Sequence, residues 1–402
     1  MNKLAITDTF CDLAYGIPLA LALGTEWVTW YCSTKTLHRE PLQIKKLLTA
    51  GIEVVMDTPL KSGEHEYMFV DIWHRGRGRG FDFPIKSVYY THDTGHCPAT
   101  PKVGEFMLYS SERQFLDSMG AASYLLDDHG SPDWGLAPQG GEGVLAGLLH
   151  LGEWSARRHE EKAALRKELA EKLGVDFDPA LPLVTYYTSE NNDGRDMDIG
   201  LHRLDGRANV VIKHNPQSLR SDAAGKNIHM CAEPTAGSFL LRFAADYILA
   251  AYASGVFTTS IMLGLRVIPV YTQRIDSFGK GGRGDLVIEE KQRWHSYTTI
   301  FQRKKSMHAD ICEHITPLHI LDTDSIFARM HDADYWKRYD EGIASVQRKI
   351  FGRCYVDDGP RRAAHYIKNL LRHGTFLTPE ISALDNEVQG SLKNVVPCSV
   401  LL

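Results

Sequence analysis

The chain has 402 residues, of which 43% are hydrophobic and 24% are charged, and these proportions exclude a mainly disordered protein. Its formal net charge of −5 provides no overall positive field for nucleic acid or an anionic membrane. We therefore expect no nucleic-acid partner, and any phosphate site must be local. The length exceeds one ordinary hydrophobic core and predicts two domains of about 150 to 200 residues each.

The first 32 residues are apolar-rich, but Asp8, Asp12 and Glu26 interrupt them. No uncharged span of about 18 residues remains there, so this segment predicts a buried strand and helix. The seven cysteines are odd in number, widely scattered and never arranged as Cys-x-x-Cys. That pattern argues against a disulfide framework or a structural zinc site and favours a reducing compartment. We expect a cytoplasmic protein, with a peripheral contact at the inner membrane face as an open alternative.

Short apolar runs rich in β-branched and aromatic residues recur through the first half of the chain. Helical patterns at 41–50 and 112–119 lie between some of them. This alternation predicts βαβ units and a mostly parallel sheet. The runs predict strands at 3–10, 26–33, 51–58, 66–73, 86–93 and 104–111.

The stretch 151–175 is dense in Ala, Glu, Lys, Leu and Arg and predicts one long helix ended by Gly174. Strand patterns then resume and indicate a second sheet, so we predict two α/β domains with a cleft between them. A helix at about 360–371 should pack near the junction. The second set of strands is predicted at 182–189, 208–216, 246–252 and 265–272.

The segment 244–271 reads as a strand, a turn of small residues, a helix, a glycine and another strand. The N–H groups at the start of such a helix, with the hydroxyls of the turn, can hold a diphosphate. Ser254, Gly255 and Thr258 are therefore candidate phosphate ligands. The alternative is an ordinary turn in which Ser254 caps the helix.

Two further positions extend this phosphate hypothesis. His214 directly follows the apolar run 208–213, which is predicted as part of a strand. It therefore lies at the carboxyl end of that strand, which in parallel sheets faces the crevice where ligands bind. An ordinary surface histidine is the alternative. Arg361 follows "VDDGP" near a predicted helix start, where a cation is unfavourable unless an anion is present.

In the first half, His92, Asp93 and His96 cluster in one loop after the strand predicted at 86–93. A histidine beside a carboxylate is a candidate general base, because its ordinary pKa lies near about 6.5. Zinc binding is the alternative, but a third convincing ligand is missing, so we expect no metal.

Five segments, in this order, resemble the CDP-glycerol glycerophosphotransferases. The resemblance spans about 89–371. It departs from the family pattern at Asp93 in the histidine turn, at Asn215 between His214 and Pro216, and at Ala251 in place of an acidic residue. The matching segments are "YYTHDTGHCP" (89–98), "HGSPDWG" (129–135), 164–190, "KHNP" (213–216) and "ADYILAAYASG" (245–255).

The resemblance implies two Rossmann-like domains of the GT-B type: an acceptor-side domain at 1–150, a donor-binding domain at 151–373, and a C-terminal tail at 374–402. It implies that glycerol-phosphate, or a related polyol-phosphate, moves from a CDP-activated donor to a cell-surface polymer or lipid-linked acceptor, as in teichoic-acid synthesis. The donor is then a substrate, and no cofactor is expected. Direct displacement with His92 as base is the implied mechanism. The predicted donor-binding residues are Thr188, His214, Ser254, Gly255, Thr258 and Arg361, and the predicted catalytic residues are His92, Asp93 and His96.

Two alternatives stay open. The serine turn also reads "ASG", as in sugar-nucleotide transferases of the same architecture, so the donor could instead be a CMP- or UDP-sugar used in capsule or lipopolysaccharide synthesis. The changed motifs at Ala251 and Asp93 also fit a non-catalytic paralogue that binds nucleotide or glycan.

Overall fold

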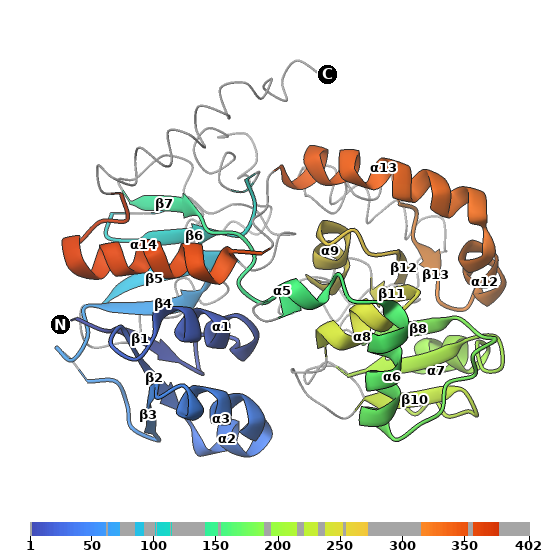
Figure 1. The fold of residues 1–402 in the computed structure, drawn as a ribbon, viewed down its shortest axis with the longest axis horizontal. Coiled ribbons are helices and arrows are strands. Elements are labelled where there is room, and N and C mark those ends of the chain that lie inside the picture. The colour runs from blue at the N-terminus through green and yellow to red at the C-terminus, as the bar shows by residue number, and fades with distance from the viewer. Residues whose placement is uncertain are drawn as a thin grey trace, which may run out of the picture.

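The computed structural model describes residues 2–61, 63–72, 85–91, 101, 103–112, 114, 141–151, 154–188, 194–214, 221–231, 238–251, 255–271, 315–352 and 357–377. These residues form two α/β domains, each built on its own parallel sheet (Figure 1). The short helix α5 (Trp154–Arg157) lies between the domains.

The first domain contains a seven-stranded parallel sheet in the order β3-β2-β1-β4-β5-β6-β7. The chain moves outward from β1 to β3 and then returns to place β4 on the other side of β1. Such a reversal opens a crevice at the carboxyl ends of the strands, where doubly wound folds bind ligands. The strands are β1 (Leu4–Thr7), β2 (Val28–Cys32), β3 (Glu53–Met56), β4 (Tyr67–Asp71), β5 (Lys86–Thr91), β6 (Phe106–Tyr109) and β7 (Glu142–Leu145).

The second domain repeats this plan with six parallel strands in the order β10-β9-β8-β11-β12-β13. Its reversal lies between β8 and β11, which pair side by side. The strands are β8 (Leu183–Tyr187), β9 (Asn209–Lys213), β10 (Ile228–Cys231), β11 (Tyr247–Ala251), β12 (Val267–Tyr271) and β13 (Leu318–His319).

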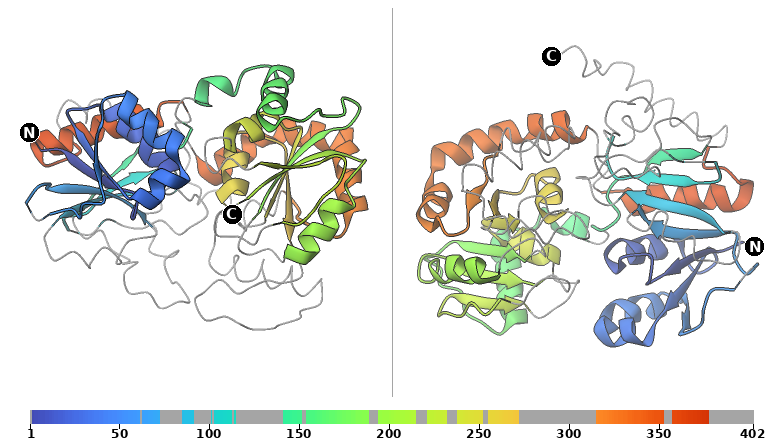
Figure 2. Two further views of the ribbon diagram at one scale, coloured as in Figure 1. Left: turned by 90° about the horizontal axis from the view of Figure 1, so that it is seen from below. Right: turned by 180° about the vertical axis from the view of Figure 1, so that it is seen from behind.

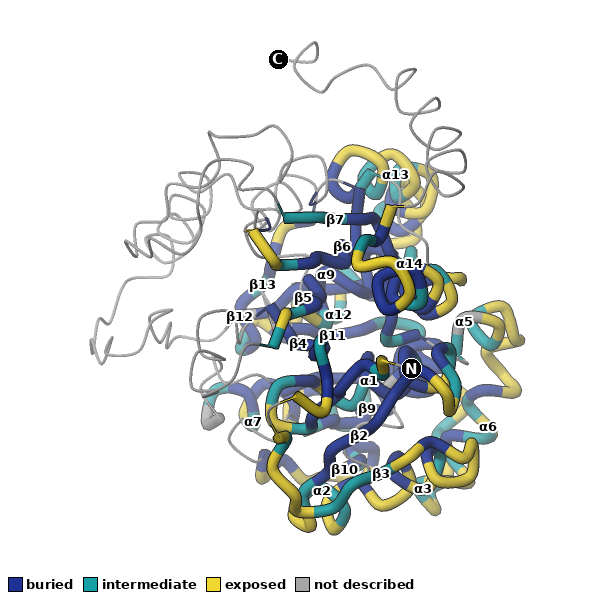
Figure 3. Tube along the Cα trace, turned by 90° about the vertical axis from the view of Figure 1, so that its left-hand side faces the viewer, coloured by how far each residue is buried: buried dark blue, intermediate teal, exposed yellow. Residues whose placement is uncertain are grey.

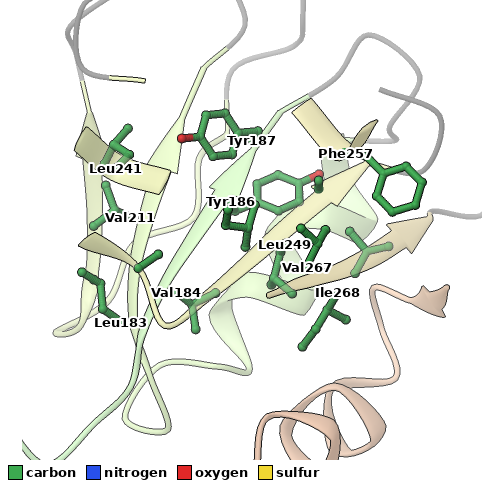
Figure 4. Packing of buried hydrophobic residues seen from close by; sticks show 14 of the residues in the cluster. Leu183, Val184, Tyr186, Tyr187, Val211, Leu241, Leu249, Phe257, Val267 and Ile268 are labelled. Carbon is green, nitrogen blue, oxygen red and sulfur yellow. The ribbon is translucent and has the colours of Figure 1, made fainter. Parts of the chain in front are cut away.

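Several strands are buried along their whole length, among them β1, β2, β4, β8 and β9. Burial on both faces is the reason that these strands read as continuous apolar runs and not as alternating ones. Figure 3 shows the buried strands in dark blue and exposed segments on outer helices such as α3 and α13. In the second domain Leu183, Val184, Leu249 and Val267 belong to one packed cluster (Figure 4).

Helices cover the sheets, and their starts follow local hydrogen-bonding rules. The Asp12 carboxylate accepts from the Ala14 N–H at 2.8 Å before α1, and the Asp332 carboxylate accepts from the Tyr335 N–H at 2.7 Å before α13. Besides α5, the helices among the described residues are α1 (Leu13–Leu23), α2 (Thr34–Arg39), α3 (Pro41–Thr49), α6 (Lys162–Leu173), α7 (Gly194–His202), α8 (Ser238–Ala244), α9 (Gly255–Met262), α12 (Thr323–His331), α13 (Ala333–Phe351) and α14 (Gly359–His373).

Helix α14, which the sequence analysis grouped with the second domain, belongs to the core of the first. Ile367, Leu370 and Phe376 join the buried cluster formed by β1, β4, β5 and α1. The ring of Phe376 lies 5.2 Å from that of Phe106 on β6. Both views in Figure 2 show α14 beside the strands of the first domain. The chain therefore crosses back over the junction after the second domain is complete.

The stretch 151–175 is not one long helix, as its composition predicts, but two: α5 and α6. Trp154 packs against the core of the second domain, while the Arg157 guanidinium pairs with Glu160 at 2.8 Å and with Glu168. The tertiary contact of Trp154 and the local pairs of Arg157 accompany the break between the two helices, where the helical propensity of the stretch is overridden. Gly174 does end α6, with φ of 63°, in the left-handed region that favours glycine.

The Asp196–Asp198 segment, whose charge pattern is typical of an exposed loop, lies inside helix α7. The Asp198 carboxylate accepts from the Ser221 hydroxyl at 2.5 Å and from the Asp222 N–H at 3.1 Å. Its charge therefore serves local structure. None of the described helices combines the length and the apolar character needed to cross a membrane.

Candidate functional site

Three neighbouring strands of the second sheet end at the same level. Tyr187 of β8 pairs with Lys213 of β9 on one side and with Ala250 of β11 on the other. Thr188 and His214 follow directly, and the Thr188 N–H donates to the Lys213 carbonyl at 3.0 Å. We call the residues that follow these three strand ends the carboxyl edge of the second sheet. It brings together segments that are far apart in the sequence.

At this edge β11 leads into α9, which begins at Gly255. Gly255 is exposed, and no described atom lies within 4 Å of the position that a Cβ would occupy there. The first N–H groups of any α-helix have no partner inside the helix. The start of α9 therefore offers N–H donors that have no partner within the helix, as an anion site requires.

Thr258 lies in the first turn of α9 and is fully buried. Its hydroxyl donates to the Gly255 carbonyl at 3.2 Å, and the Thr259 hydroxyl donates to the same oxygen at 2.6 Å. The hydroxyl predicted as a phosphate ligand therefore holds the helix turn. Ser254, the other predicted hydroxyl, lies outside the described residues.

A buried cation, which the sequence analysis missed, lies behind this edge. Arg242 of α8 is only 7% exposed, and its guanidinium lies 5.3 Å from the Tyr187 ring and 4.8 Å from the Phe239 ring. Burial lowers the pKa of the Arg242 guanidinium, and the contact with Tyr187 opposes that change. Lys213, the last residue of β9, is likewise buried. The only signal in the sequence is an arginine inside the apolar helix "SFLLRFA".

Two buried cations lie at the ends of adjacent strands: Arg242 contacts Tyr187 at the end of β8, and Lys213 ends β9. This concentration of positive charge suits an anionic ligand at the carboxyl edge, because charge-assisted hydrogen bonds are stronger than neutral ones.

Arg361 lies elsewhere. It belongs to the first turn of α14 and lines a cavity of about 580 Å³ whose walls come from both domains, with Ile17 of α1, Trp154 of α5 and Phe239 of α8. Thr188, His214, Gly255 and Thr258 are not among the residues that line this cavity. The structure thus brings these four residues to one edge and places Arg361 in the interdomain cavity.

The predicted catalytic residues His92, Asp93 and His96 lie outside the described residues. The strand before them, β5, ends at Thr91 between β4 and β6 near the middle of the first sheet. The Thr91 hydroxyl donates to Gln114 Oε1 at 2.9 Å, and the Ser110 N–H donates to the Thr91 hydroxyl at 3.1 Å. This buried polar network holds the strand end from which the histidine loop departs.

A second buried group at the carboxyl edge of the first sheet is Asp71, the last residue of β4. It is 5% exposed, and its carboxylate accepts a hydrogen bond from the Tyr15 hydroxyl. The sequence analysis treated Asp71 only as part of a strand. Within the described ranges, no group of three or more His, Cys, Asp or Glu side chains has the arrangement of a metal site.

Comparison with proteins of known structure identifies the fold type. No family model matches this sequence, and no curated protein matches it. A solved structure of a variant of the wall teichoic acid polymerase TagF is similar over 93% of this chain and 88% of that one, with a TM-score of 0.54 at 11% identity. A TagF structure soaked with CDPG covers the same shares, with a TM-score of 0.53 at 10% identity. A glycosyltransferase from Rickettsia africae covers 92% of this chain and 99% of its own, with a TM-score of 0.46 at 10% identity. The two parallel-sheet domains and the likeness to TagF show a fold of the GT-B type.

Proposed function

We propose that this protein is a transferase that moves a glycerol-phosphate, or a related polyol-phosphate, from a CDP-activated donor to a cell-surface polymer or lipid-linked acceptor. The observation that carries the proposal is the convergence of Thr188, His214 and Gly255 at the carboxyl edge of the second sheet. These residues come from three separate segments of the sequence that resemble CDP-glycerol glycerophosphotransferases.

The chemistry of this edge supports a diphosphate ligand. The N–H groups at the start of α9 and the imidazole of His214 can donate to phosphate oxygens. Arg242 and Lys213 place positive charge behind them. Charge that builds on the leaving nucleotide would be stabilised by these donors without a divalent ion.

The likeness to TagF supports the choice of donor. TagF is a wall teichoic acid polymerase, and one of its structures was soaked with CDPG. The fold likeness extends over both domains of the present chain. We propose that the reaction takes place in the cytoplasm, with peripheral contact at the inner membrane face where a lipid-linked acceptor would lie.

A nucleotide-sugar donor is the second candidate, and Ala251 favours it. This residue ends β11 directly before the "YASG" turn, at a position where the glycerophosphotransferase pattern has an acidic side chain. The turn that follows also reads "ASG", as in sugar-nucleotide transferases of the same architecture, and therefore fits a CMP- or UDP-sugar.

Nucleotide release from a panel of donors tests both candidates. The purified protein is incubated with CDP-glycerol, CDP-ribitol, CMP-sugars and UDP-sugars, each with and without a lipid-linked glycan primer. Release of CMP from CDP-glycerol or CDP-ribitol supports the first proposal, since a glycerol-phosphate transfer leaves that nucleotide. Nucleotide release only from a CMP- or UDP-sugar supports the second candidate, a glycosyltransferase. Binding without release by any donor contradicts both and indicates a non-catalytic paralogue.

The carboxyl edge makes a specific prediction about affinity. His214→Ala is expected to weaken nucleotide binding by about 1 to 3 kcal/mol, because a hydrogen bond to a charged group is lost. Isothermal titration calorimetry with the nucleotide measures the change.

His331→Ala is the matched control for that measurement. His331 ends α12 beside Met330, whose carbonyl accepts from the Tyr247 hydroxyl at the start of β11. The control histidine therefore lies at the opposite edge of the same sheet, and its replacement should leave affinity unchanged. If His214→Ala, His331→Ala and the unsubstituted protein bind the nucleotide with equal affinity, His214 does not contact the donor.

A further inference from the structure

One wall of the interdomain cavity is formed by the uncharged helix α1. Helix α1, "LAYGIPLALAL", carries no charged residue, although one of its faces is not covered by the core. A helix that is apolar all round is normally buried on every side. On α1, Leu21 is 40% exposed, and Leu13, Pro18 and Ala22 are half-buried. All four line the cavity.

These apolar residues form one continuous stripe. Leu13, Ala14, Ile17, Pro18, Leu21 and Ala22 follow a spacing of one, three, one, three and one residues, which keeps them on a single helical face. The stripe runs for about 13 Å along the helix. This length suits an extended hydrocarbon chain.

The opposite wall is aromatic and comes from the junction and the second domain. Trp154 of α5 and Phe239 of α8 line it, together with His150, whose ring stacks on Phe239 with the centroids 5.7 Å apart. The cavity volume of about 580 Å³ lies within the range of about 300 to 1,000 Å³ that is typical of small-molecule sites.

Positive charge gathers at the same cavity. Lys46 of α3 and Arg361 of α14 line it, and Arg361 is exposed. Among the described lining residues, Asp357 alone is acidic, and it is paired with Arg158, whose Nη2 donates to Asp357 Oδ2 at 3.1 Å. A cation in the first turn of a helix, such as Arg361 in α14, is unfavourable toward the helix dipole unless an anion is nearby.

We infer that this cavity binds a single-chain amphiphile with an anionic head group. The apolar chain lies along the α1 stripe against Trp154 and Phe239, and the anionic head meets Lys46 and Arg361. The inference does not rest on the transferase reaction, because Thr188, His214, Gly255 and Thr258 do not line this cavity.

Decyl phosphate, kept below its critical micelle concentration, is the probe, with decanol and inorganic phosphate as partial probes. Calorimetry on the full chain should show one-to-one binding of decyl phosphate. Decanol should bind about three- to fivefold more weakly, as expected for the loss of an exposed charge pair, and inorganic phosphate should show no saturable binding. Absence of saturable decyl phosphate binding would overturn the inference.

Two matched pairs of variants locate the site. Leu21→Glu places a charge on the stripe and should weaken decyl phosphate binding by more than about tenfold, because a buried charge without a partner is unfavourable. Leu48→Glu, at a leucine that is 56% exposed on α3 and outside the cavity, should not change binding. Arg361→Ala should reduce decyl phosphate affinity about three- to fivefold and leave decanol affinity unchanged, whereas Arg338→Ala on α13 should change neither.

Equal effects of Leu21→Glu and Leu48→Glu would show adsorption to any apolar surface and contradict the site. A chain ending at Leu377 that binds decyl phosphate, while the full chain does not, would identify residues 378–402 as the occupant and also contradict it. Donor binding by the Leu21→Glu variant is measured in parallel. If this variant loses decyl phosphate binding but still binds the donor, the amphiphile site is separate from the proposed transferase site.

Discussion

His92→Ala is expected to lower turnover by about 10²- to 10⁴-fold while nucleotide affinity stays nearly unchanged. The hydroxyl of an acceptor is a poor nucleophile near neutral pH and needs a base within hydrogen-bonding reach. His92 directly follows Thr91, which ends β5 at the carboxyl edge of the first sheet. Steady-state kinetics with the donor identified by the panel, together with calorimetry for nucleotide affinity, measure both quantities.

The position of this histidine in the chain gives the prediction its physical basis. Thr91 is fixed by hydrogen bonds with Gln114 and Ser110, so the chain leaves the sheet from a rigid point. A base that departs from a rigid strand end can be held in one geometry, which is the condition for efficient proton transfer. Asp93 and His96 follow within the same loop segment of the sequence.

The control is His38→Ala, at an exposed histidine in the last turn of α2 in the same domain. Its replacement should leave turnover unchanged. Full turnover by the His92→Ala variant would show that another group acts as the base, with His96 next to be tested. Loss of activity in EDTA that a divalent ion restores would show a metal-dependent mechanism instead.

Leu370→Ala is expected to lower the free energy of unfolding by about 2 to 5 kcal/mol, the range for cavities created in well-packed cores. Leu370 is fully buried in the cluster that joins α14 to the first domain. The loss should fall on that domain, since α14 packs there and not in the domain that precedes it in the sequence. Urea unfolding measures the total change, and native-state hydrogen exchange locates it.

Exchange should accelerate in β1, β4 and β5 and stay unchanged in β8 and β9. Leu377→Ala provides the control, because Leu377 lies just beyond α14 and is 45% exposed. Its effect should stay within about 0.5 kcal/mol. Faster exchange confined to β8 and β9 after Leu370→Ala would contradict the assignment of α14 to the first domain.

Most of the sheet architecture could be predicted from the pattern of residues along the chain. Its apolar runs coincide with ten strands, from β1 at Leu4–Thr7 to β12 at Val267–Tyr271, because strands buried on both faces must be apolar throughout. Gly174 ended α6 as predicted, since a left-handed residue at a helix end favours glycine. The alternation of strands and helices was sufficient to predict two parallel-sheet domains.

The short strands β7, β10 and β13 were not predicted. The pattern "EGVL" of β7 contains a glycine, and β10 keeps His229 and Met230 partly exposed, so neither reads as an apolar run. These strands form because neighbouring strands offer them a sheet edge. Pairing with a neighbour is a property of the tertiary structure, and local residues carry little of that information.

The candidate site residues differ in the same way: some could be predicted from local sequence, and others depend on tertiary packing. Helix starts and strand ends are local features, so His214 and Gly255 could be proposed from the sequence, and the sheet then brought them together. Arg242 could not be proposed, because its importance depends on Tyr187, 55 positions earlier in the chain. Arg361, predicted as a donor ligand, lines the interdomain cavity because α14 returns to pack on α1, and the sequence could not predict that position. Local sequence records the propensities of single elements, whereas burial and packing between distant elements decide which side chains share a site.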